Sequence, residues 1–149
     1  MNALTAPTRI LPTLATPDRR RDVRPLLDTA TRTVAAALGQ LDLCPHVPAW
    51  PAAPTTENHH LPTIRAAAVQ IALHARTDRC DRCANREHQM RAAARLAELW
   101  LKLLRTCIRH VTQPQRFPLH LTQRAAACLA DHVAWVITGR PHYLLGQPA

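Results

Sequence analysis

The positions of the prolines place the strongest limit on what this chain can fold into. The sequence has thirteen prolines and only three glycines, and most of the prolines lie within the first 62 residues or after residue 113. Proline fixes φ and lacks a backbone N–H, so it interrupts helix interiors. The proline-poor stretches are rich in alanine and leucine, with few aromatic or β-branched runs, which favours helices over sheets. The chain is therefore predicted to be all-α.

Apolar side chains at three- and four-residue spacings predict four helices, at about residues 22–43, 62–77, 85–111 and 122–138. Pro25 and Pro62 fall in first turns, where proline is tolerated. Asn85 fits an N-cap, and Gly139 followed by Pro141 forms a helix stop. Four helices of this length in a chain of 149 residues predict a single four-helix bundle.

The domain organisation follows from the segments that surround these helices. Residues 1–21 are predicted to be a disordered basic arm, and residues 141–149 a C-terminal tail. Residues 44–61 contain four prolines and are predicted to form a long loop between the first two helices. Residues 22–140 are then one helical domain.

The sequence gives no sign of export or of a membrane span. Its first residues are broken by prolines and lack an apolar core of signal-peptide length. No run of about 18 uncharged apolar residues occurs. Five cysteines, an odd number without a secretory signal, are expected in a reducing cytoplasm as free thiols or metal ligands. The expected location is therefore cytoplasmic.

The strongest candidate for a functional motif is CDRC, which contains Cys80 and Cys83. Two cysteines separated by two residues can bind one zinc ion from a tight turn, but a tetrahedral site needs two further ligands. Cys44 and His46, at the head of the long loop, are the predicted second half, because this loop can reach either end of the second helix. The sequence therefore predicts a structural zinc site that ties the first helix to the turn after the second.

The fourth ligand, and whether metal binds at all, stay open from the sequence. His88, near Cys83 at the start of the third helix, competes with His46, while His59 and His60 are further substitutes. In one competing interpretation the cysteine pair consists of ordinary thiols in a turn. In another it is redox-active, which is disfavoured because no βαβ pattern surrounds it.

A second group of cysteines and histidines lies in the last two predicted helices. Cys107 and His110 are about 33 Å from the cysteine pair if residues 85–107 form one helix, so they cannot share its ion. In an antiparallel hairpin they approach Cys128 and His132, and the four side chains could form a metal- or small-molecule-binding interior with enzymatic activity. The competing interpretation is that the cysteines pack as apolar side chains and the histidines bond to carbonyls or water.

Enzymatic function has little other support in the sequence. It contains no glycine-rich phosphate loop, nucleophile elbow or zinc-protease histidine pair. The ten acidic residues are scattered without a suggestive pairing. A binding function is therefore favoured over catalysis.

Positive charge is concentrated in the arm and on the third predicted helix. The net charge is +9. On a helical projection one narrow stripe of the third helix holds five cations, with apolar residues over most of the remainder. These cations are Arg91, Arg95, Lys102, Arg105 and Arg109. The pattern predicts a helix that is buried on two or three sides and exposes one basic edge.

Such an edge is expected to contact nucleic-acid phosphates, with Arg19, Arg20 and Arg21 of the arm adding affinity. The alternative is a solvated face that keeps an apolar helix soluble. Aromatic residues make up only 3% of the chain, and Trp100 and Trp135 fall on predicted apolar arcs. Backbone contact, not base stacking, is therefore expected to dominate.

Protein partners are the other class that the sequence supports. The apolar arcs of the last three predicted helices exceed what a minimal bundle needs, which points to a homodimer or a protein-interaction module. The run RAAARLAELWLKLLRTCIRHV resembles the last helix of small Ala/Arg-rich helical proteins of unknown function from high-GC actinobacteria. That resemblance implies no chemistry and no site residues. The expected protein is a small basic binding or regulatory protein.

Overall fold

The structure, a computed structural model, describes residues 2–51, 61–77 and 86–139. In these ranges the chain forms four helices and no strand. The helices are α1 (Asn2–Gly39), α2 (Leu61–Thr77), α4 (Glu87–Thr112) and α5 (Leu119–Thr138). The predicted all-α four-helix bundle is therefore confirmed.

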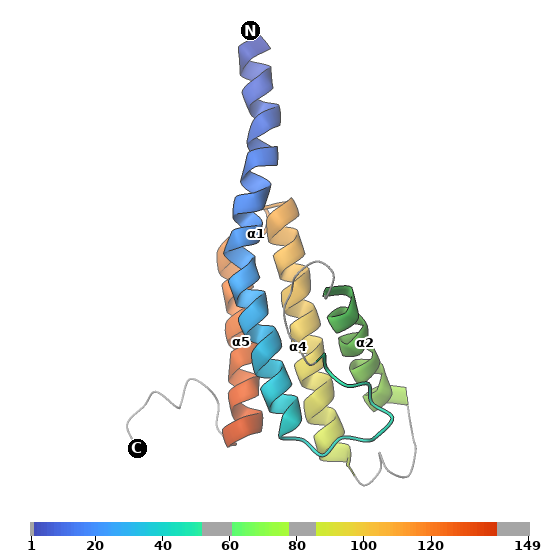
Figure 1. The fold of residues 1–149 in the computed structure, drawn as a ribbon. Coiled ribbons are helices and arrows are strands. Elements are labelled where there is room, and N and C mark those ends of the chain that lie inside the picture. The colour runs from blue at the N-terminus through green and yellow to red at the C-terminus, as the bar shows by residue number, and fades with distance from the viewer. Residues whose placement is uncertain (1, 52–60, 78–85, 140–149) are drawn as a thin grey trace, which may run out of the picture.

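α4 is the central helix of the bundle. It packs against α1, α2 and α5, and α1 also packs against α5. In Figure 1, α4 runs in the opposite direction to the other three helices. The helix is unbroken from Glu87 to Thr112, and its buried side chains cover the sides that face its neighbours. The prediction of a helix that is buried on several sides is confirmed.

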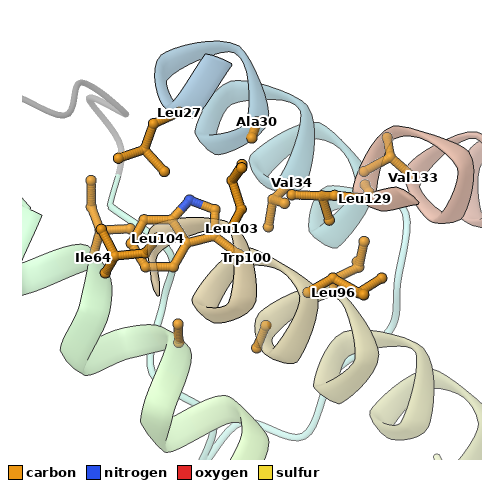
Figure 2. Close-up of a cluster of buried hydrophobic side chains, with 14 of the residues drawn as sticks. Leu27, Ala30, Val34, Ile64, Leu96, Trp100, Leu103, Leu104, Leu129 and Val133 are labelled. Carbon is orange, nitrogen blue, oxygen red and sulfur yellow. The ribbon is translucent and has the colours of Figure 1, made fainter. Parts of the chain in front are cut away.

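The core is built around Trp100 of α4, whose side chain is fully buried. Figure 2 shows its ring among Leu27 of α1, Ile64 of α2 and Leu104 of α4. A buried indole N–H needs a partner. Here the Trp100 Nε1 donates to Thr31 Oγ1 at 2.9 Å.

Thr31 links three parts of the chain through hydrogen bonds. Its hydroxyl accepts from Trp100 and donates to the Leu27 carbonyl at 2.7 Å within α1. Its own carbonyl accepts from Trp50 Nε1 at 3.2 Å. The Trp50 ring meets the Trp100 ring edge to face, with 5.6 Å between the centroids. The segment after α1 is thereby held on the side of the bundle.

α1 differs from the prediction at its start. It begins at Asn2, not near residue 22, so residues 2–21 of the predicted arm form its first turns. Figure 1 shows this part of α1 extending beyond the other helices, where water can satisfy backbone groups left unpaired by Pro7, Pro12 and Pro17. The flexibility of the arm in solution stays a prediction, and the predicted tail at 141–149 lies outside the described residues.

The helix ends agree with the sequence in part. Gly139 has φ of 75°, in the left-handed region, and its N–H donates to the Trp135 carbonyl at 2.7 Å. This confirms the predicted helix stop. The N-cap of α4 is Arg86, so the prediction of Asn85 at this position is wrong, and α5 begins at Leu119, earlier than expected. In the part of the chain that is described, no helix is both long and apolar enough to cross a membrane.

Candidate functional site

The outward face of α4 carries five exposed cations, here called the basic edge. They are Arg91, Arg95, Lys102, Arg105 and Arg109. Because neighbouring helices cover the other sides of α4, this edge is its main contact with solvent. From Arg91 to Arg109 it extends about 27 Å along a single helix axis.

The cations of the basic edge differ in the ion pairs that they form. Arg91 pairs with Glu87, one turn earlier, and Arg95 Nη1 lies 4.0 Å from Glu98 Oε2. Exposed pairs of this kind are weak, so both guanidinium groups can exchange partners. Lys102 and Arg105 form no ion pair within the described ranges.

Arg109 is engaged with an aromatic ring instead. Its guanidinium carbon lies 5.2 Å from the centroid of Phe117, and that of Arg116 lies 5.8 Å from the same centroid. These cation–π contacts leave both charges exposed to solvent. Arg116 therefore adds positive charge at the upper end of the basic edge, a contribution that the sequence did not suggest.

Arg19 has a structural contact that the sequence did not indicate. Its Nε donates to the Val111 carbonyl at 3.0 Å, in the last turn of α4. A cation that bonds to a terminal carbonyl stabilises a helix C-terminus. Its predicted nucleic-acid contact stays a prediction, and so do those of Arg20 and Arg21, which are exposed on α1.

α1 provides a second basic surface. Arg20, Arg21, Arg24 and Arg32 line an open groove of about 580 Å³ along this helix, together with Asp28. The positive charge of the molecule is therefore spread over two helices.

His132 marks where α5 meets the basic edge. Burial lowers the pKa of its imidazole, and the charge of Arg95 acts in the same direction. A hydrogen bond with the Ala92 backbone and the charge of Asp131 oppose that shift in pKa. These neighbours show that His132 lies against the first half of α4.

Trp135, one turn after His132, is 54% exposed. The prediction that it faces the apolar core is wrong. Its neighbours Ala134 and Val136 point toward the core while Trp135 points outward. The apolar character of this stretch concealed an exposed ring, and only the packing of α5 on α1 and α4 reveals it.

Cys44 and His46 lie together at the lower end of the bundle. The Cys44 Sγ is 3.6 Å from His46 Nδ1, and the His46 ring is 6.3 Å from that of His74 on α2. Cys44 is buried and packs with Met90 of α4. Cys44 and His46 are therefore close to each other, while their role as zinc ligands stays a prediction.

The segment that carries these two residues is fixed to the start of α4. Arg86 Nε lies 3.1 Å from Asp42 Oδ2, and the Asp42 N–H donates to Gln89 Oε1 at 3.2 Å. Cys80 and Cys83 lie outside the described residues, as do His59 and His60.

The described residues do not complete a metal site by themselves. Among them, no group of three or more histidine, cysteine or acidic side chains could hold a metal ion. His88 is exposed in the first turn of α4. The choice between His46 and His88 as fourth ligand stays a prediction.

The second predicted group does not assemble. Cys107 is buried, Cys128 is exposed, and His132 lies beside Ala92, about 22 Å along α4 from Cys107. His110 Nδ1 donates to the Phe117 carbonyl at 2.9 Å. All four residues are described and no metal-binding group is found among them, so the four side chains do not meet as that alternative required.

Burial also raises the pKa of the Cys107 thiol to about 12. A thiol with this pKa stays protonated at neutral pH and is neither a ready metal ligand nor a nucleophile. The competing interpretation, an apolar cysteine with a carbonyl-bonded histidine nearby, describes Cys107 and His110 correctly.

An apolar groove of about 250 Å³ lies between α1, α4 and the start of α2. Aliphatic side chains line most of it: Val23, Leu27, Leu61, Leu104, Ile108 and Val111. Arg20 and Arg24 also line it. Ile108, which also lines the groove, is 52% exposed.

Comparisons with protein-family models, curated proteins and solved structures find no match for this chain. The resemblance of residues 91–111 to Ala/Arg-rich actinobacterial proteins therefore stays a prediction.

Proposed function

We propose that this protein binds nucleic acid through the basic edge of α4, chiefly by phosphate contacts, and that it acts as a regulator. The observation that carries the proposal is the line of five exposed cations on one unbroken helix. Successive cations are separated by about 4.5 to 10.5 Å along the axis, so each can meet a different phosphate. The net charge of +9 favours approach of a polyanion.

The test is a salt series with a matched pair of variants. Arg105→Gln removes a cation that has no ion pair in the described ranges, whereas Arg65→Gln removes an exposed arginine from α2. Binding to DNA or RNA is expected to weaken in Arg105→Gln, with the salt slope smaller by about one phosphate contact, and to be unchanged in Arg65→Gln. Absence of binding by the unmodified protein at low salt would end the proposal.

We also propose that Cys44, His46, Cys80 and Cys83 hold a structural zinc ion, with His88 as the alternative to His46. The proximity of Cys44 to His46 supports this proposal. So does the attachment of their segment near Arg86, three residues after Cys83. Such a site would hold the end of α1, the end of α2 and the start of α4 together.

Elemental analysis of protein purified under reducing conditions with zinc present tests the site. One zinc per chain is expected in the unmodified protein and in Cys128→Ser, an exposed cysteine outside the site. Cys83→Ser is expected to lose the zinc. Unmodified protein without zinc, or Cys83→Ser that retains it, would refute the assignment.

A second candidate function is protein binding through the apolar groove between α1 and α4. The exposed Ile108 supports it, and Arg20 and Arg24 favour an acidic amphipathic helix as the occupant. A second copy of this basic chain is a poorer fit by charge. Ile108→Glu is expected to abolish capture of such a helix, and a molecular mass in solution that matches a dimer would favour self-association instead.

A further inference from the structure

Trp135 has no packing role that accounts for its position. It is 54% exposed, the largest exposed fraction among the exposed large apolar side chains of the described residues. The other tryptophans in these ranges, Trp50 and Trp100, pack against each other and bond to Thr31. Phe117 is engaged by Arg109 and Arg116. Trp135 therefore offers an indole face that none of these contacts occupies.

The register of α5 on α4 places this ring near the basic edge. Thr122 Oγ1 donates to the Thr106 carbonyl at 3.4 Å, and His132 lies beside Ala92 and Arg95. The two helices are therefore antiparallel, and residues later in α5 lie beside residues earlier in α4. Trp135, three residues after His132, comes level with the part of α4 near Arg91 and is rotated by about 60° from His132.

The surroundings of α4 disfavour a duplex as the ligand. A recognition helix has to enter the major groove of DNA, which is wide enough for one helix. α4 is packed on three sides and presents only a narrow edge, which fits a groove less well than a helix with a wide exposed face does. A single strand can follow a flat basic edge, and its unpaired bases are available for stacking.

We infer that the nucleic acid bound by the basic edge is single-stranded, and that one of its bases stacks on Trp135 while Arg91 and Arg95 contact the adjacent phosphates. This inference rests on the proposed function. It specifies that the nucleic acid is single-stranded and that Trp135 is the residue that favours a single strand over a duplex. Because every base has a flat π face, the contact favours unpaired strands with little sequence preference.

The experiment compares an oligothymidylate with a duplex of the same length, at low salt, by affinity and by tryptophan fluorescence. Trp100 is fully buried and Trp50 is partly buried against it, so quenching on binding is expected to come chiefly from the exposed Trp135. The single strand is expected to bind more tightly than the duplex. Trp135→Ala should lose the quenching and about tenfold in affinity for the single strand, with duplex binding unchanged.

Two further variants control for indirect effects. Trp135→Phe keeps an aromatic face and should retain most of the affinity. Ile137→Ala, at an exposed apolar position on the same helix, should behave like the unmodified protein. If Trp135→Ala binds the single strand as tightly as the unmodified protein, or still shows quenching, this inference is overturned and the proposed function stands. If no nucleic acid binds at low salt, both are overturned.

Discussion

At the scale of single residues, Thr31 has the largest structural role relative to its size. It is fully buried in α1, and its hydroxyl and carbonyl are both bonded to tryptophan side chains. A buried donor that loses its acceptor keeps the whole cost of its desolvation. The position of Trp100 in the core therefore depends on one hydroxyl group.

Replacing that hydroxyl tests this dependence. Thr31→Val keeps the side-chain shape but leaves Trp100 Nε1 without its acceptor, so the free energy of unfolding is expected to fall by about 1–3 kcal/mol. Urea unfolding followed by circular dichroism measures the change. Thr33→Val is the control, because Thr33 bonds only to the Ala30 carbonyl one turn earlier, and its effect should be smaller. Equal losses in the two variants would contradict this role for Thr31.

Single residues were also where prediction from sequence failed. Cys107, His110, Cys128 and His132 share suitable spacings, but spacing does not determine how two helices are offset along their axes. Thr106 faces Thr122, which places Cys128 and His132 beside earlier turns of α4. Trp135 was misassigned for a related reason, since an apolar residue type does not indicate which side of a helix is covered.

At the scale of elements, the α4–α5 interface contains His132, a histidine whose pKa is lowered. Burial disfavours the charged form of His132, and Arg95 on the facing helix disfavours it further. The folded state therefore holds this imidazole neutral more strongly than the unfolded chain does. Asp131 and the Ala92 backbone reduce this preference without reversing it.

The sign of the resulting pH dependence follows from linkage. Because the pKa of His132 is lower in the folded state, its contribution to stability is present above the ordinary pKa of 6.5 and is lost as pH falls through that value toward the folded-state pKa. The urea midpoint of the unmodified protein should fall more between pH 7.5 and pH 5.5 than that of His132→Gln. Parallel pH profiles for the two proteins would refute this coupling.

Whole elements were predicted better than residues. Hydrophobic period and stop signals identified α2, α4 and α5 closely, because each signal acts within one or two turns. The start of α1 was missed because Pro7, Pro12 and Pro17 were counted as breakers, although α1 continues through them to Asn2. For the zinc site, Cys44 and His46 lie close together but are only two residues apart in the chain, and the cysteine pair lies outside the described residues, so the site stays a prediction.

At the scale of the molecule, the wide apolar arc of the third predicted helix indicated that this helix is buried on several sides. α4 indeed packs against all three other helices. Which helix contacts which of the others could not be predicted, because that depends on long-range packing that no local pattern specifies. The structure shows α1 packed on α4 and α5, and α2 packed chiefly on α4.

This arrangement predicts unequal stability within the bundle. α2 has one main interface, so it can detach without disturbing the contacts of α1 with α4 and α5. Native-state hydrogen exchange, measured by mass spectrometry, should show faster exchange for the amides of residues 64–74 than for those of residues 96–107. Exchange at the same rate in both segments would indicate that the four helices open as one unit.

The opposite direction of α4 also gives the molecule an electrical polarity. Three helices end at the same end of the bundle and only one begins there, as Figure 1 shows. Each helix C-terminus carries about half a negative charge, and the N-terminus of α4 can offset only one of the three. The uncancelled partial charges lie at the end that contains Cys44 and His46, so the backbone itself makes that end attractive to a metal cation.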